Sequence, residues 1–328
     1  MRRLAMAAVL AVAVAALGGG ADPAYACDCG STVGPLAGGG GVAGAGVRYI
    51  AFPDGATTLV AAISSDGQAV NWGRLPGRWG IPQVADDGTT GGLSGDGRTL
   101  VLAAYSSAFP QRTSRFAVLR AHSVRVERTI RLRGDVTFDA ISPDGGMLYL
   151  IQHPRPGGQS YRVRAYSVAA GRMLRRPVID PTRWGTVMSG VALTRVAPAD
   201  ASYDYTLYDR GGGRTFIHAL DTVHAKAVCI DLPRVTPATM LTLRLAGDGS
   251  RIVVLANGRP FRVVDTNTYA VTAPARPVPA VSAEASRPGG GVSWAWALPA
   301  AIALLGAAAA LVLRRRGATL TAWRPRSG

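Results

Sequence analysis

The stretch 138–150, FDAISPDGGMLYL, constrains the fold of this 328-residue chain more than any other part of it. Its centre, Ser142 to Gly145, is turn chemistry, because proline presets φ at the second position and glycine accepts a left-handed backbone without steric cost. The residues after the turn, 147–151, are continuously apolar, which indicates a strand covered on both faces. Such a strand needs neighbours, so the stretch predicts one unit of a larger β-structure.

The same pattern recurs through the middle of the chain, with the turn aspartates 42 to 56 residues apart. Segments of alternating hydrophobicity, such as 124–127 and 161–168, lie between the copies, so each unit holds about four strands. This period and strand number are typical of a β-propeller, with a β-sandwich or a β-solenoid as the alternatives. The copies are centred on Asp54, Asp96, Asp144, Asp200 and Asp248. In the copy at Asp200 the residue after the aspartate is not glycine.

The turn S-P-D-G followed by a short apolar strand resembles the PD40, TolB-type and YVTN-type WD40-like propellers of bacterial envelopes. The resemblance covers roughly 47–271 and rests on a short motif. It implies an all-β, β-propeller-like repeat domain of about five four-stranded blades. It implies no particular activity, because propellers with this motif serve unrelated functions.

The N-terminal 26 residues are typical of a secretory signal. Two arginines precede an apolar run at 4–17, and Ala-Tyr-Ala at 24–26 is an A-x-A cleavage site that leaves Cys27 at the mature N-terminus. Lipidation of Cys27 is an alternative, although the preceding residues lack the usual aliphatic residue of a lipobox. The following segment, 27–46, is rich in glycine and predicts a flexible lead into the repeat domain at 47–272.

The C-terminal part predicts a membrane anchor. Residues 273–291 form a Pro- and Gly-rich linker, and 292–313 is a run of 22 uncharged residues, long enough to span a bilayer as a helix. The basic tail at 314–328 begins with three arginines that favour the cytoplasmic side. We therefore expect a single-pass protein of the cell membrane with the domain at 47–272 outside and the C-terminus in the cytoplasm.

The chain has a net charge of +16. Without the signal and the tail it still has 29 basic residues and only 19 acidic ones. Such a field attracts anionic polymers or lipid headgroups, and mere solvated charge is the alternative interpretation. Nucleic acid is not an expected partner outside the membrane. Lys226 is the only lysine, and this preference for arginine indicates a high-GC genome, which suggests an actinobacterium.

The three cysteines, Cys27, Cys29 and Cys229, make an odd count. A disulfide from Cys229 to one of the pair is one interpretation, and a buried apolar side chain is the other. Neither the cysteines nor the four scattered histidines show the spacing of metal ligands.

The usual catalytic motifs are absent: there is no G-x-S-x-G, no H-E-x-x-H and no P-loop. Several carboxylates are the turn aspartates Asp54, Asp66, Asp96, Asp144 and Asp248, whose structural role explains them. Asp200, Asp204 and Asp209 lie close in sequence but match no calcium loop, so a plain loop is expected there. We therefore predict no catalytic, cofactor-binding or metal residue.

The best candidate binding surface in the sequence is a short aromatic and cationic segment, with tryptophans that cover the core as the alternative. The predicted function is a non-enzymatic, membrane-anchored binding or scaffolding protein that meets an anionic envelope polymer or a protein partner. The alternative is a propeller-fold envelope enzyme of hydrolase type, which would bring carboxylates and histidines from several blades to the central channel. The candidate surface residues are Trp72, Arg74, Arg78 and Trp79.

Overall fold

The computed structural model describes residues 41–44, 46–106, 109–155, 160–183 and 187–275. Within these ranges the chain forms strands and turns with no helix. No helix in the described part is therefore long and apolar enough to cross a membrane, and the predicted span at 292–313 lies outside it. The predicted signal peptide and basic tail also lie outside the described residues. The chain separates into two units, 1–274 and 275–328, and every strand belongs to the first unit.

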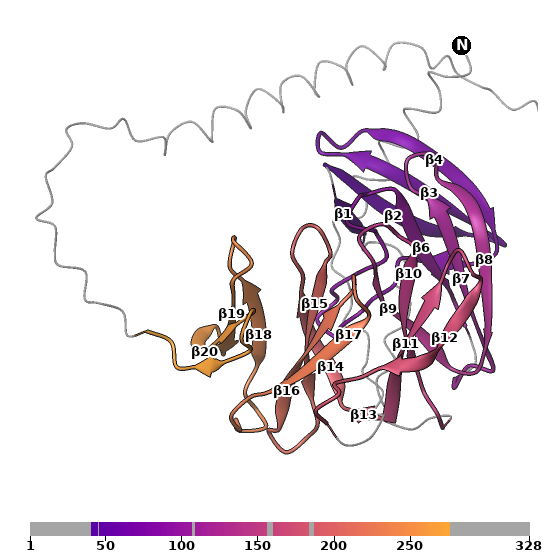
Figure 1. The fold of residues 1–328 in the computed structure, drawn as a ribbon. Coiled ribbons are helices and arrows are strands. Elements are labelled where there is room, and N and C mark those ends of the chain that lie inside the picture. Colours follow the sequence, from indigo (N-terminus) through magenta and orange to yellow (C-terminus); the bar gives the residue numbers. More distant parts are fainter. Residues whose placement is uncertain (1–40, 45, 107–108, 156–159, 184–186, 276–328) are drawn as a thin grey trace, which may run out of the picture. The chain divides into compact units, whose positions relative to one another are not determined.

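Five antiparallel sheets follow one another along the chain, and in each one hydrogen bonding runs from one strand to the next (Figure 1). Sheet 1 contains β1 (Val42–Gly44), β2 (Val47–Asp54), β3 (Thr57–Ser64) and β4 (Ala69–Pro76). Sheet 2 contains β5 (Trp79–Gly80), β6 (Thr99–Ala104), β7 (Thr113–Arg120) and β8 (Arg125–Arg133). Sheet 3 contains β9 (Val136–Ile141), β10 (Met147–Gln152), β11 (Ser160–Ser167) and β12 (Arg172–Val178), with β13 (Met188–Ser189) paired to β11.

The last two sheets have the same order. Sheet 4 contains β14 (Val191–Val196), β15 (Tyr203–Asp209), β16 (Thr215–Asp221) and β17 (Lys226–Asp231). Sheet 5 contains β18 (Leu241–Leu245), β19 (Arg251–Ala256), β20 (Arg259–Asp265) and β21 (Val271–Thr272). This topology confirms the prediction of an all-β fold built from four-stranded repeat units, and five such sheets lie in the described residues.

The repeat turns at Asp144, Asp200 and Asp248 occupy equivalent places in sheets 3 to 5, where each joins the first strand to the second. The turn at Asp96 does the same in sheet 2, between a bridge at Leu93 and strand β6. The copy at Asp54 is different, because it joins the second and third strands of sheet 1. The sequence repeat is therefore out of phase with the sheet in its first copy.

Strand β10 shows why the apolar run after the turn is needed. Leu148, Tyr149 and Leu150 are fully buried. The two leucines belong to the core shared with sheet 2, and Tyr149 belongs to the core shared with sheet 4, where its hydroxyl donates to the Thr222 carbonyl at 2.8 Å. The strand is covered on both faces, as the sequence predicts.

Each hydrophobic core lies mainly between sheets that are neighbours in the chain. One joins sheets 1 and 2, one joins sheets 2 and 3, two join sheets 3 and 4, and one joins sheets 4 and 5. One of the two between sheets 3 and 4 also contains Ala85, from the segment between β5 and β6 of sheet 2. Among the described residues no core cluster joins sheet 5 to sheet 1.

The turn aspartates hold their own turns together. The Ser142 hydroxyl donates to Asp144 Oδ1 at 2.6 Å, and the Gly146 amide donates to the same oxygen at 2.9 Å. The Ser142 hydrogen bond stabilises the charged form and lowers the pKa of Asp144. Asp96 accepts an equivalent pair of hydrogen bonds, so the structural role expected of these aspartates is present.

The repeat turn of sheet 2 contacts the repeat turns of sheets 3 and 4. The Asp96 amide donates to the Pro143 carbonyl at 2.9 Å. A Cβ built on Gly95 would lie 2.0 Å from the Asp200 carbonyl oxygen, so only glycine fits between these two turns. The repeat turn of sheet 2 therefore lies between those of sheets 3 and 4.

Candidate functional site

The structure separates the two tryptophans of the candidate surface. Trp72 lies on β4 with 52% of its side chain exposed, whereas Trp79 on β5 is only 5% exposed. Trp79 packs in the core between sheets 1 and 2, and its indole nitrogen donates to the Pro76 carbonyl at 2.8 Å. The core interpretation therefore applies to Trp79, which cannot present its ring to a partner.

The two arginines of the candidate surface have separate contacts. Arg74 forms an exposed ion pair with Asp54, and the Arg78 guanidinium lies 5.6 Å from the centroid of the Tyr105 ring. Only Trp72 remains an exposed aromatic residue in the set. A binding role for Trp72, Arg74 and Arg78 stays a prediction.

A larger basic surface lies on the outer strands of sheets 2 and 3. In β8 the single acidic residue, Glu127, pairs with Arg120 of β7, and β12 contains no acidic residue. The two strands are close at Gly171, where a built Cβ would lie 2.8 Å from Arg128 Nη1. We call this surface the arginine face, and its exposed members are Arg125, Arg128, Arg131, Arg133, Arg172, Arg175 and Arg176.

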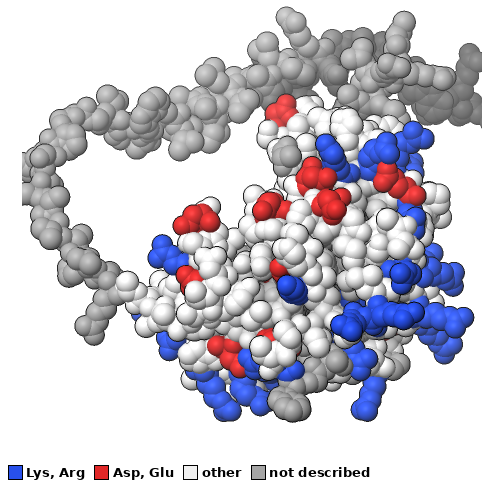
Figure 2. All heavy atoms as spheres, viewed as in Figure 1, with Lys and Arg blue, Asp and Glu red and all other residues white. Residues whose placement is uncertain are grey.

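Figure 2 shows arginines gathered on the side where β8 and β12 lie in Figure 1, with the acidic groups mainly elsewhere on this view. Both strands are the outermost of their sheets. Charges on outer strands also prevent edge-to-edge pairing between copies of a protein, so edge protection is a second role for the same residues.

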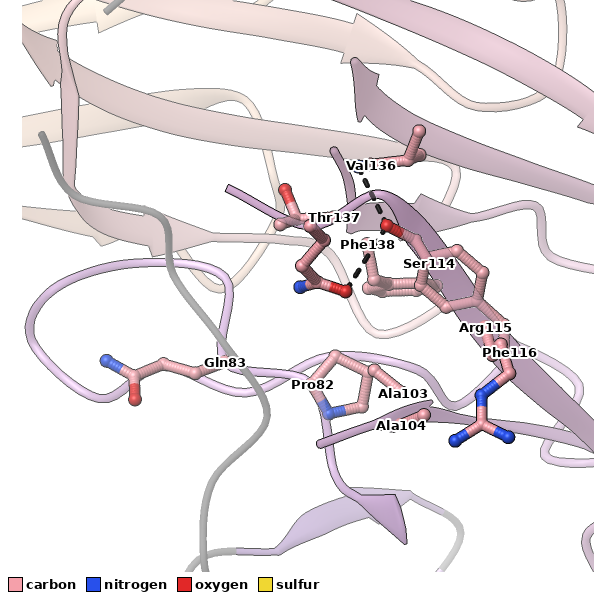
Figure 3. Close-up of a pocket in the computed structure, with 11 residues that line it drawn as sticks. Pro82, Gln83, Ala103, Ala104, Ser114, Arg115, Phe116, Val136, Thr137 and Phe138 are labelled. Atoms are coloured by element: carbon pink, nitrogen blue, oxygen red, sulfur yellow. Dashed lines mark hydrogen bonds between the residues drawn. The ribbon is translucent and has the colours of Figure 1, made fainter. Parts of the chain in front are cut away.

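A small pocket lies between sheets 2 and 3, lined by Pro82, Phe116 and Phe138 among others (Figure 3). Its volume is about 20 Å³, which is room for roughly one water molecule. The Ser114 hydroxyl in its wall accepts from the Val136 amide at 2.9 Å and donates to the Gly134 carbonyl at 3.0 Å. This pocket is too small for an organic ligand.

The larger cavity has a volume of about 300 Å³ and lies where the inner strands of sheets 1, 3 and 4 meet the segment between β5 and β6 of sheet 2. Strands β1, β9 and β14 contribute to its wall, together with the glycine-rich segment 90–95. Inner strands of successive sheets around one cavity are the arrangement expected at the centre of a propeller. Its charged lining residues are Asp139, Arg195 and Asp204.

Arg195 on β14 is the centre of this charged group and is only 8% exposed. Its Nη2 pairs with Asp139 Oδ1, its Nη1 donates to the Asp139 carbonyl at 2.5 Å, and its Nε donates to the Thr206 hydroxyl at 2.8 Å. Asp204 is more loosely attached, with Oδ1 3.6 Å from Arg195 Nη1. The group joins sheet 3, which supplies Asp139, to sheet 4.

Burial changes the protonation of the groups around Arg195. Desolvation raises the pKa of Asp204 to about 7, against the opposing effect of the Arg195 charge, and the nearby Asp139 raises it further. Behind these residues, desolvation lowers the pKa of His218 to about 4. At neutral pH His218 is therefore neutral, and Asp204 is near its midpoint.

His218 and Cys229 lie next to each other on β16 and β17, with Nδ1 3.9 Å from Sγ. Burial raises the pKa of the Cys229 thiol to about 11, so the thiol stays protonated beside a neutral imidazole. An activated cysteine needs the opposite shift. Cys229 is buried and free, as one of the two sequence interpretations has it, while Cys27 and Cys29 lie outside the described residues.

The three aspartates of 200–209 have different roles. Asp200 accepts from the Ser202 amide at 3.0 Å, Asp209 accepts from the Gly211 amide at 2.7 Å, and Asp204 faces the cavity. Within the described ranges no group of three or more His, Cys, Asp or Glu residues is arranged to hold a metal ion.

The sequence did not identify Arg195, Asp139 or Asp204 as a group. Arg195 stands in an alternating strand, VALTRV, where an arginine usually faces water. The available signal was Asp139, a charge inside the apolar segment FDAI on a strand expected to be buried. Its partner, 56 residues away on another sheet, has no signal in the local sequence.

No family model matches the sequence, and no curated protein matches it. Solved structures with some likeness include the Cps50 (Swd1) β-propeller domain of Myceliophteria thermophila, at 14% identity and a TM-score of 0.41, covering 70% of this chain and 67% of that one. An oligogalacturonate lyase in complex with manganese has 12% identity and a TM-score of 0.46, covering 73% and 65%. TolB from Acinetobacter baumannii has 11% identity and a TM-score of 0.38, covering 69% and 51%. The fold assignment rests on the sheets described above, and no residue role is transferred from these proteins.

Proposed function

We propose that this chain is a non-enzymatic binding protein of the cell envelope, whose arginine face binds an anionic polymer. The observation that supports the proposal is the concentration of seven exposed arginines on β8 and β12, with Glu127 as the only acidic residue of the two strands. A surface of one charge raises the local concentration of oppositely charged ligands. Arginine also pairs with phosphate and carboxylate groups through two hydrogen bonds at once.

The central cavity offers the enzyme alternative two carboxylates, but the groups around them are engaged within the protein or neutral. Asp139 is committed to Arg195, and the neighbouring His218 and Cys229 are both neutral near pH 7. Two carboxylates do converge on the cavity from two sheets, as an enzyme would require, but no activated nucleophile accompanies them in the described residues.

The proposal places the domain outside the membrane, held by a helix at 292–313 with the tail at 314–328 in the cytoplasm. The apolar run, the preceding linker and the arginines after it support this topology. The predicted secretory signal at 1–26 supports export of the domain.

The arginine face is tested by replacing Arg125, Arg128, Arg131 and Arg133 with glutamine in the full chain. Each arginine near an anionic surface contributes about 1 kcal/mol, so we expect affinity for polyphosphate to fall roughly a hundredfold or more. Binding by the unchanged chain should also weaken steeply with salt, because screening limits the reach of surface charges to about 8 Å at physiological ionic strength. Titration at several salt concentrations measures both effects.

The matched control replaces four exposed arginines in the strands of sheet 5 and in the segments next to strands of sheet 4. It should bind polyphosphate nearly as well as the unchanged chain, and equal losses in both variants would contradict a localised face. If the β8 variant binds normally but aggregates, edge protection is the role of these arginines. The control positions are Arg214, Arg234, Arg244 and Arg259.

The proposed topology has its own test. In a chain with Cys27, Cys29 and Cys229 replaced by serine, a cysteine introduced next to Gly328 should stay unlabelled when intact cells are treated with a membrane-impermeant maleimide, and should be labelled after lysis. Val70, which is 58% exposed on β4, is the matched position in the domain, and a cysteine there should be labelled in intact cells. Labelling near Gly328 in intact cells would exclude a cytoplasmic tail.

A further inference from the structure

The cavity between the inner strands has an excess of negative charge, in contrast to the positively charged arginine face. Arg195 contributes one positive charge, and Asp139 and Asp204 contribute two negative charges when both are ionised. The hydrogen bonds that Arg195 donates go to Asp139 and Thr206. The carboxylate of Asp204 has only the ion-pair contact of 3.6 Å to Arg195 and no hydrogen bond among the described residues.

Asp204 is thus an acceptor without a donor in the wall of a cavity. The residue is 91% buried, since its exposed fraction is 9%. A buried carboxylate without hydrogen bonds is costly, and that cost disfavours the charged form. A ligand that supplies a positively charged donor would remove the cost.

The remaining wall limits the kind of ligand. The side chains of Thr90 and Ser94 already donate within the protein, to the Gly41 carbonyl at 2.7 Å and to Asp96 at 2.6 Å. Leu93, Phe138 and Ile141 supply apolar surface. The cavity therefore offers the carboxylate of Asp204, and beside it the buried, unpartnered Oδ2 of Asp139, next to apolar and glycine-rich walls in a volume of about 300 Å³.

We infer that this cavity binds a small organic ammonium ion, with its amino group on Asp204 and its carbon body against the apolar wall. An anion is disfavoured by the net charge of the three side chains. A charge-assisted hydrogen bond from an ammonium group to a carboxylate is roughly twice as strong as a neutral one. The site is separate from the arginine face and takes a ligand of opposite charge, so it does not depend on the proposed function.

The test compares two probes of similar shape, cyclohexylamine and cyclohexanol, by calorimetric titration of the full chain at pH 8. Cyclohexylamine should bind at least ten times more tightly than cyclohexanol. Asp204→Asn keeps the size of the side chain and should reduce cyclohexylamine affinity at least tenfold. Asp54→Asn, at an exposed residue of sheet 1, is the control and should leave the affinity unchanged.

The groups around Asp204 give the test a second readout. Arg195 on β14 and Asp139 on β9 are the charged groups that act on it, and His218 on β16, close to both, is neutral above pH 5. Cyclohexylamine affinity should therefore fall between pH 8 and pH 5 as Asp204 gains a proton, and in Asp204→Asn it should not. Equal binding of the two probes, no binding of either, or unchanged affinity in a folded Asp204→Asn variant would overturn the inference.

Discussion

Replacing Arg195 with methionine should destabilise the domain by about 3–5 kcal/mol at pH 8, the cost of leaving buried carboxylates without their partner. The guanidinium is the only cation paired with Asp139 in the described residues, and both side chains are almost fully buried. The loss should be smaller at pH 5, because Asp204, with a pKa of about 7, is then protonated and needs no counter-charge. Urea denaturation at the two pH values measures the difference.

The sign of this pH effect follows from Asp204 itself. Its folded pKa lies above its unfolded value of 3.8, so its contribution to stability is fully present below pH 3.8 and is lost as pH rises through about 7. Asp204→Asn should therefore make the domain more stable than the unchanged chain at pH 8 and change it little at pH 4.

Two further variants complete the test of Arg195. Arg74→Met removes an exposed ion pair and should cost less than about 1 kcal/mol. Combining Arg195→Met with Asp139→Asn and Asp204→Asn should recover much of the loss, because no uncompensated charge remains. If Arg195→Met is as mild as Arg74→Met, the buried group is not holding sheets 3 and 4 together.

Gly95→Ala should cost about 3 kcal/mol, at the upper end of the range for overpacked sites. The new Cβ would lie 2.0 Å from the Asp200 carbonyl oxygen, and a backbone oxygen cannot move away without moving its turn. A domain of this size should then melt roughly 10 °C lower, and differential scanning calorimetry measures the shift.

Gly247→Ala is a control at the same position of another repeat copy. Gly247 precedes Asp248 as Gly95 precedes Asp96, but a Cβ built there meets nothing within 4 Å. The change should be neutral or slightly stabilising, because alanine restricts the unfolded chain. Similar melting temperatures for the two variants would show that the turns of sheets 2 and 4 are not in contact.

Local chemistry made much of the fold predictable. The turn signals at Asp96, Asp144 and Asp248 depend on residues within six positions, and the structure places each between the first two strands of a sheet. The first copy was not predictable in this way. The turn at Asp54 has the same chemistry but lies between the second and third strands of sheet 1. Turn residues specify a hairpin, and they do not specify which hairpin of the sheet it is.

The candidate site was less predictable, because burial depends on contacts between sheets. Trp72 and Trp79 look equivalent in the sequence, yet one is exposed on an outer strand and the other is covered by sheet 1. Asp204 and Asp200 lie four residues apart, yet one enters the cavity and the other holds a turn. Whether a charged side chain faces water or a partner is decided by residues far away in the chain.

The missing core between sheets 5 and 1 in the described residues has a further consequence for how the domain unfolds and evolves. Since no cluster there ties sheet 5 to sheet 1, each of these two terminal sheets depends on one neighbouring sheet, as the end repeats of a linear repeat protein do. Sheets 1 and 5 each share a core with one neighbour and sheet 3 with two, so amide exchange should be fastest in the two terminal sheets. A repeat gained or lost at either end would leave the remaining cores intact.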